Sequence, residues 1–184
     1  MAKRVSLSGE EKSIKSILSW YDDHLQAIND FRYKILDKRA SSKSRVKIAE
    51  KFKRFDIDKI NEYFDNSEGE LERLVCLDLI SAIEAFLRVD YHQRIKDRDK
   101  SEIGRAFRDL NKKKGNKISL EEDIIETWKS NTGTPSFSNL LGLLKYRHWL
   151  AHGRYWAPKL GRVYSFDITY KISENILDVV SKQG

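Results

Sequence analysis

The segment LERLVCLDLISAIEAFLRVDY, residues 71–91, is the most apolar part of the chain. Its apolar side chains recur every three or four positions, which places them on one broad face of an α-helix. They are Leu71, Leu74, Val75, Leu79, Ile83, Phe86, Leu87 and Tyr91. Just before them, Ser67 and Glu70 have the spacing of a capping box, in which the two side chains accept backbone N–H groups. We therefore predict a central core helix that begins near Ser67.

Helical periodicity also marks the rest of the N-terminal half. An apolar stripe from Ile14 to Ile35 follows a second capping-box pair, Ser8 and Glu11. The basic run over residues 36–54 predicts a polar turn and a short helix. We interpret residues 55–64 as a further short helical turn.

The C-terminal half contains three more predicted features. Ser119 and Glu122 repeat the capping spacing before an apolar group that includes Trp128, and residues 132–135 (TGTP) are a loop. A helix that contains residues 137–144 continues into the next segment and stops near Gly153. The stretch VYSFDITYKI, residues 163–172, alternates like a strand, but apolar residues four apart favour a closing helix that starts near Asp167.

Composition places the chain among helical proteins. Two prolines and nine glycines in 184 residues leave few positions that would end short strands, while 40% hydrophobic residues suffice for one packed core. We expect an all-α bundle with antiparallel core helices and a short extended segment after Trp156. We expect one domain over residues 1–184, with basic N-terminal helices over 1–66 and the core over 67–184.

The single cysteine, Cys76, excludes an intramolecular disulfide and a thiolate zinc cluster built from one chain. The first residues contain no apolar run, and Asp78 and Glu84 interrupt the most apolar segment. We therefore expect a cytoplasmic protein with no export signal, no membrane span and no metal or other cofactor.

The net charge of +7 is unevenly distributed along the chain. Residues 1–54 contain 14 Lys or Arg and 7 Asp or Glu, residues 55–93 contain 3 and 10, and residues 94–184 contain 18 and 11. The most basic local stretch, residues 94–117, includes Lys112, Lys113 and Lys114. Basic regions of this kind attract polyanions, and such binding weakens as salt rises. The alternative is that these regions are solvated helix faces that keep the protein soluble.

The segment KYRHWLAHGRYW, residues 145–156, contains two of the four histidines, two of the four tryptophans and two arginines. Imidazole exchanges protons near neutral pH, and the guanidinium fork fits phosphate oxygens. Together they suit phosphodiester cleavage. A neutral His takes the proton from a 2′-hydroxyl that attacks phosphorus, an Arg stabilises charge on the non-bridging oxygens, and a second His protonates the leaving 5′-oxygen.

Two other interpretations of this segment stay open. A His near a helix C-terminus caps carbonyl groups, and Arg147 can form a structural salt bridge. Alternatively, His148 and His152 have the i, i+4 spacing of two zinc ligands on one helix face, but no Glu follows His148 and no third ligand can be named. Trp149 and Trp156 are expected to pack, although Tyr155 and Trp156 also suit stacking on unpaired bases.

Arg147 and His152, followed by Gly153, have the spacing R-x4-H late in a helical chain. Earlier, Glu84 and Arg88 form an E-x3-R element. These two motifs, in this order, resemble the R-x4-6-H and E-x3-K/R elements of the HEPN superfamily of helical ribonucleases. The resemblance covers residues 71–180. It implies a homodimer in which two Arg/His pairs face each other in a basic cleft and cleave RNA without metal.

The resemblance also implies residue roles. Arg147 binds or polarises the phosphate and His152 is the acid/base, while Glu84 and Arg88 are auxiliary residues of the cleft. His148 stands where the family often has Asn or Asp, and it is a further auxiliary candidate. Members silenced by a nucleotidyltransferase antitoxin carry Tyr two positions after the motif His. Arg154 occupies that position here and Tyr155 follows it, which argues against regulation by tyrosine modification.

Arg147 and His152 pose a geometric problem. Five residues span about 500° of an ideal helix, so the two side chains point roughly 140° apart and do not meet on a straight helix of one chain. A facing second chain brings an Arg and a His together, which favours a dimeric site. A helix that ends or bulges near Gly153 is the other solution.

The expected function is therefore a metal-independent endoribonuclease, acting as a toxin or phage-defence effector. Its expected partners are RNA, a second copy of the chain and an antitoxin or other defence-system protein. The residues expected to bind RNA are Lys112, Lys113, Lys114, Arg154 and Tyr155. The alternatives are a noncatalytic HEPN-like module that binds RNA or a partner protein, and a purely structural helical dimer.

Overall fold

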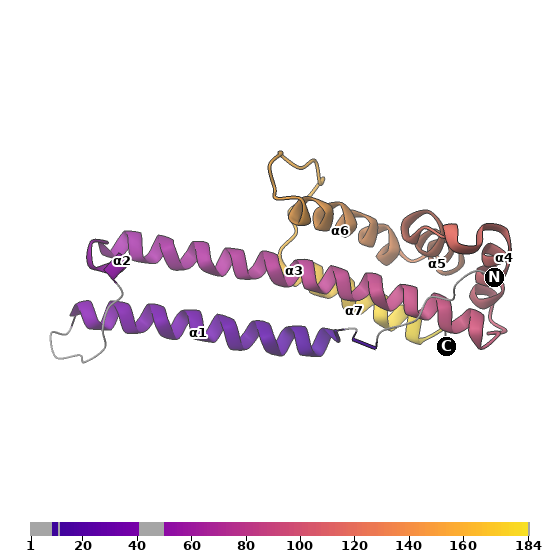
Figure 1. Ribbon diagram of the computed structural model, residues 1–184, viewed down its shortest axis with the longest axis horizontal. Coiled ribbons are helices and arrows are strands. Elements are labelled where there is room, and N and C mark those ends of the chain that lie inside the picture. Colours follow the sequence, from indigo (N-terminus) through magenta and orange to yellow (C-terminus); the bar gives the residue numbers. More distant parts are fainter. Residues whose placement is uncertain (1–8, 11, 41–49, 184) are drawn as a thin grey trace. The chain divides into compact units, whose positions relative to one another are not determined.

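The computed structural model describes residues 9–10, 12–40 and 50–183 (Figure 1), and all regular elements within them are helical. This confirms the predicted all-α class for the described residues. The elements are α1 (Ile14–Ala40), α2 (Glu50–Lys53), α3 (Ile57–Lys96), α4 (Glu102–Lys114), the 3₁₀-helix η1 (Gly115–Lys117), the π-helix η2 (Leu120–Ile125), α5 (Glu126–Thr132), α6 (Pro135–Ala151) and α7 (Phe166–Ser181). No helix among the described residues is both long and apolar enough to cross a membrane.

The chain divides into two compact units. One comprises Ile14–Val75, and the other comprises Met1–Ser13 together with Cys76–Gly184. In the first unit, Ile35, Phe52, Ile60 and Phe64 form a buried cluster. The rings of Phe52 and Phe64 stack with their centroids 5.7 Å apart, which joins the short helix α2 to α3.

The long helix α3 begins at Ile57, ten residues before the predicted start. An Asp56 carboxylate oxygen accepts the backbone N–H of Lys59 at 2.8 Å and caps the first turn. Ser67 lies inside the helix, where its hydroxyl donates to the Tyr63 carbonyl oxygen at 2.8 Å. The predicted start near Ser67 and the separate helical turn over residues 55–64 are therefore wrong. Neither Pro nor Gly occurs in residues 57–66, so nothing ends the helix before Ser67.

Other predicted boundaries in the N-terminal half have mixed outcomes. The stripe from Ile14 to Ile35 is helical as predicted. The capping pair Ser8–Glu11 lies outside the described residues. In the basic run, the described short helix is α2, in which Phe52 is buried. On α3, Leu74 is 56% exposed although we placed it in the core, whereas the neighbouring Val75 is fully buried.

The second unit has an aromatic and aliphatic core. The buried face of α3 contributes Leu79, Ile83 and Leu87, all less than 2% exposed. Trp128 of α5 stacks on Phe137 of α6 at a ring-centroid distance of 5.6 Å and meets Phe107 of α4 edge-on at 6.2 Å. On α7, the buried Ile172, Ile176 and Val180 recur every four residues.

Arg94, near the end of α3, is a buried ionic junction of the same unit. Its Nε lies 2.9 Å from Asp90, its Nη1 lies 2.7 Å from Asp99, and the same Nη1 donates to the Gln183 carbonyl oxygen at 2.9 Å. The guanidinium also lies 5.1 Å from the centre of the Trp128 ring. Arg94 thus ties the end of α3 to α5 and to the end of α7.

Two helix starts in the C-terminal half follow the predicted local signals, whereas α4 was not predicted. Ser119 accepts the Glu122 backbone N–H at 3.3 Å as predicted, although the helix it caps is the π-helix η2. Ser165 caps α7, whose first residue, Phe166, agrees with the predicted start near Asp167. The strand-like alternation does not form a strand, and the described residues 157–165 contain no regular element, so the predicted extended segment is not a strand.

Candidate functional site

Arg147 of α6 and Glu84 of α3 form an ion pair. Arg147 Nε lies 3.4 Å from Glu84 Oε1, and the two side chains are 39% and 19% exposed. The pair is half-buried, so it is screened by water less than a surface pair. The structure therefore joins the two sequence elements on which the family resemblance rests, although they lie far apart in the chain.

Several charged side chains act on the carboxyl group of Glu84. Burial raises the pKa of Glu84, and the nearby carboxylate of Glu121 raises it further, while Arg147 and Arg88 act in the opposite direction. Arg88 is exposed and lies one turn after Glu84 on the same face of α3. Glu121 comes from the first turn of η2. One acidic and two basic groups, from three elements, thus act on this carboxyl.

His148 and His152 form an imidazole pair at the C-terminal end of α6. Their ring centroids are 4.2 Å apart with an angle of 49° between the planes, and both residues are exposed. His152 is the residue that ends the helix, and its backbone N–H donates to the His148 carbonyl oxygen at 3.1 Å. Two groups that transfer protons near neutral pH therefore lie next to each other at the surface.

The chain reverses direction directly after the imidazole pair. Gly153 has a φ of +78°, a left-handed conformation that favours glycine, and Arg154 follows with a φ of +56°. The Arg154 backbone N–H donates to the Trp149 carbonyl oxygen at 3.3 Å, which closes the last turn as in a Schellman motif. The predicted stop near Gly153 is confirmed, and Tyr155, 85% exposed, lies beyond it.

The two predicted catalytic side chains have different neighbours within one chain. Arg147 contacts Glu84, whereas His152 contacts His148. The helix does end before His152, but this end brings the imidazole to His148 instead of to the guanidinium.

The lysines expected to bind RNA occupy another part of the unit. They lie at the C-terminal end of α4, and Figure 1 shows α4 and the loop after α6 at opposite ends of the unit. Lys112 pairs with Asp109 at 3.2 Å, and Lys114 pairs with the buried Asp123 at 2.5 Å, while Lys113 is exposed. The structure therefore does not bring these lysines together with Arg154 and Tyr155.

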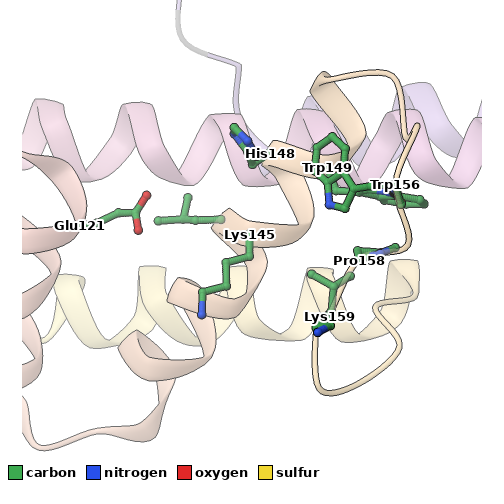
Figure 2. Close-up of a pocket in the computed structure, with 9 residues that line it drawn as sticks. Glu121, Lys145, His148, Trp149, Trp156, Pro158 and Lys159 are labelled. Atoms are coloured by element: carbon green, nitrogen blue, oxygen red, sulfur yellow. Dashed lines mark hydrogen bonds between the residues drawn. The ribbon is translucent and has the colours of Figure 1, made fainter.

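A pocket of about 290 Å³ adjoins the imidazole pair (Figure 2). Its apolar lining consists of Leu144, Trp149, Trp156, Pro158 and Leu160, and its polar lining consists of Glu121, Lys145, His148 and Lys159. Trp149 Nε1 donates to the Trp156 carbonyl oxygen at 2.8 Å and thereby holds the loop after α6 against the helix.

Sequence reasoning missed most of this pocket. It identified Trp149 and Trp156 as packing residues and did not single out Glu121, Lys145 or Lys159. The density of aromatic and basic residues after Leu144 is a usable signal for the α6 side of the pocket. No local pattern connects Glu121 to that side, because it lies on η2 and reaches the pocket through tertiary packing.

No group of three or more His, Cys, Asp or Glu side chains suited to a metal ion occurs in the part of the chain that the structure describes. Comparison of the chain with protein-family models, with curated proteins and with solved structures gives no match. The relationship to the HEPN superfamily therefore rests on the Arg147/His152 and Glu84/Arg88 motifs and stays a prediction.

Proposed function

We propose that this protein is an endoribonuclease of the HEPN type that cleaves RNA without metal. The observation that carries the proposal is that Arg147, His148 and His152 lie at the end of α6, with Arg147 paired to Glu84 of α3 and the two imidazoles adjacent and exposed. A guanidinium and two adjacent imidazoles are the groups that cleavage by an internal 2′-hydroxyl needs. The proposal includes a HEPN-like bundle with antiparallel core helices.

In this mechanism, one neutral imidazole removes the proton from the 2′-hydroxyl. The 2′-oxygen then forms a bond to phosphorus as the bond to the 5′-oxygen breaks, and a second, protonated imidazole donates its proton to the leaving oxygen. His152 is one of these groups, and His148 is the candidate for the other. The products are a 2′,3′-cyclic phosphate and a 5′-hydroxyl.

Arg147 stabilises the negative charge that develops on the non-bridging phosphate oxygens. Glu84 lies 3.4 Å from Nε without a hydrogen bond to it, and the terminal Nη groups of the fork are the ones assigned to the phosphate. Glu84 acts as a positioning residue that sets the direction of the guanidinium. Arg88, exposed one turn later, adds positive charge to the same region.

The active form in this proposal is a homodimer. Within one chain Arg147 and His152 contact different partners, which supports a site in which Arg147 of one copy faces His152 of the other. The loop after α6 also exposes apolar surface at Tyr155 and Val163, which are 85% and 82% exposed. An RNA-cleaving activity of this kind suits a toxin or phage-defence effector, whose partner is an antitoxin or another defence-system protein.

The test is the chemistry of the RNA ends. Purified protein is incubated with single-stranded RNA in EDTA, and the ends are identified for the wild type, Arg147→Ala, His152→Ala and the control His24→Ala, which changes an exposed histidine on α1. We expect cyclic-phosphate ends from the wild type and the control, and rates lower by about 10²–10⁴ for the two site variants. Cleavage that requires Mg²⁺ or survives both site substitutions contradicts the mechanism, and a strictly monomeric protein contradicts the shared site.

A noncatalytic HEPN-like module that binds RNA or a partner protein is the second candidate. The half-buried position of the Arg147–Glu84 pair favours it, because such a pair also serves simply to join α3 to α6. RNA binding without any turnover in the same assay identifies this function.

A further inference from the structure

The pocket beside the imidazole pair has a volume and lining that suit one flat heterocycle. Its volume is about 290 Å³, and two indole rings, Trp149 and Trp156, line it together with aliphatic side chains. Aromatic side chains contribute most of the stacking energy when proteins hold unpaired bases. The Trp149–Trp156 hydrogen bond fixes one wall before any ligand arrives, so little ordering is needed on binding.

The polar groups at this pocket form a specific set. Glu121 supplies a carboxylate, which accepts hydrogen bonds only, and Lys145 and Lys159 supply ammonium groups, which donate only. Figure 2 shows Glu121 on the side of the pocket across from Trp149 and Trp156. A well-matched ligand therefore presents donors toward Glu121 and acceptors toward the lysines.

We propose that this pocket binds a single unpaired guanine base of the RNA substrate. Guanine carries two adjacent donors, N1–H and the N2 amino group, which together satisfy both oxygens of a carboxylate. Its O6 and N7 atoms are acceptors that suit an ammonium group. Adenine, cytosine and uracil each lack the adjacent pair of donors. This inference rests on the proposed function, because it assigns the base next to the phosphate that is cleaved.

The pocket is connected to both parts of the proposed catalytic machinery. His148 lines the pocket and also contacts His152. Glu121, on the other side, is one of the charged groups that act on Glu84, and Glu84 forms the ion pair with Arg147. In this proposal, the phosphate of the bound guanosine lies next to His148 and His152, and Arg147 of the other copy completes the site. This arrangement predicts cleavage at one fixed position relative to a guanine.

The first test uses free nucleotides, so it does not depend on RNA cleavage. GMP, AMP, CMP and UMP are titrated into the full chain, and binding is followed by tryptophan fluorescence and calorimetry. We expect GMP to bind at least about tenfold more tightly than the other three nucleotides. This is the discrimination that a bidentate contact between a carboxylate and the two guanine donors gives. Glu121→Gln should lose this preference, because an amide offers one acceptor and one donor. Glu122→Gln, which removes the same charge at the next residue of η2, should retain it.

The second test maps the cut sites on a single-stranded RNA that contains every dinucleotide. We expect the cuts to cluster at one position relative to guanine in the wild type and in Glu122→Gln, and to lose that register in Glu121→Gln. Equal binding of the four nucleotides, or a guanine preference that survives Glu121→Gln, overturns the inference. If GMP binds selectively but no RNA is cleaved, the guanine pocket stands and the proposed ribonuclease function fails. If RNA is cut without base preference, the ribonuclease function stands and the guanine pocket fails.

Discussion

The imidazole rings of His148 and His152 lie 4.2 Å apart at the point where α6 ends, after Ala151. Residues four apart are neighbours on a helix, but His152 has already left the helical conformation, with φ −100° and ψ 26°. The rings therefore meet at an exposed corner where both reach solvent. One of them is adjacent to the pocket, and both belong to the segment that contains Arg147.

If His148 is the second proton-transfer group, His148→Ala lowers the cleavage rate by about 10² or more, as His152→Ala does. The double variant should then be little slower than either single variant, because the two groups act as a unit. The measurement is a single-turnover rate with an end-labelled RNA. A rate for His148→Ala equal to that of the His24→Ala control limits His148 to a scaffold role.

Glu84→Gln tests whether the carboxylate positions Arg147. The substitution keeps the size of the side chain and removes its charge, so the free energy of unfolding should change by only about 1 kcal/mol or less for this half-exposed pair. The cleavage rate should nevertheless fall by about tenfold, while nucleotide binding in the pocket stays intact. The matched control is Glu62→Gln, an exposed position on the same helix. An unchanged rate would show that Arg147 needs no partner.

Gly142 is predicted to be essential for the packing of Tyr164 on α6. A Cβ atom at this position would overlap the Tyr164 hydroxyl, while the Tyr164 ring stacks on Tyr146 at 5.4 Å. Gly142→Ala should therefore reduce the free energy of unfolding by about 1–3 kcal/mol in urea titrations. Because the overlapping atom is the hydroxyl oxygen, adding Tyr164→Phe should recover a substantial part of the loss. Strictly additive effects of the two substitutions would refute this packing.

Gly153→Ala separates backbone strain from crowding. No heavy atom lies within 4 Å of the added Cβ, but the φ of +78° is costly for any residue with a side chain. We expect a loss of about 1–2 kcal/mol in the free energy of unfolding. Cleavage should also fall, because the turn determines where His152 lies. Thermal unfolding and the single-turnover rate test both effects, and a neutral substitution would contradict the left-handed turn.

We expect the contribution of Asp99 to the free energy of unfolding to be lost in acid. Hydrogen bonds from Ser101, together with the Arg94 guanidinium, lower the pKa of this carboxyl to about 2, against an unfolded value of about 3.9. Its contribution to stability is therefore fully present above about pH 4 and is lost as the pH falls toward 2. In urea titrations, the difference between wild type and Asp99→Asn should shrink over this interval. The exposed control Asp22→Asn should show no such trend, and a constant difference for Asp99→Asn would disprove the linkage.

Lys113 and Lys114 are neighbours with different expected roles. Lys114→Ala leaves the buried Asp123 carboxylate without its ammonium partner and should destabilise the protein by about 1–3 kcal/mol. Lys113→Ala should leave stability unchanged. If α4 contacts RNA, Lys113→Ala removes about one phosphate contact. The slope of the logarithm of the binding constant against the logarithm of the salt concentration then becomes shallower by about one. Urea titrations and binding measured at several salt concentrations separate the two effects.

Local patterns predicted several elements of this fold. The Ser119 cap, the stop at Gly153 and the start of the last helix near Asp167 are confirmed, since each depends on hydrogen bonds and backbone angles within a few residues. The start near Ser67 is wrong for the same local reason. A capping pair inside a helix looks the same in the sequence as one at its beginning, and only the continuity of residues 57–66 distinguishes them.

The sequence by itself determined the helical class, three helix boundaries in the C-terminal half and the concentration of His and Arg in residues 145–156, because periodicity and capping act over one or two turns. Only the tertiary structure decided which side chains meet. It pairs Arg147 with Glu84, places Glu121 at a pocket with Trp149 and Trp156, and separates the α4 lysines from Tyr155. The reason is that these contacts depend on how buried apolar faces from distant segments pack together, and residue spacing along one helix does not encode that packing.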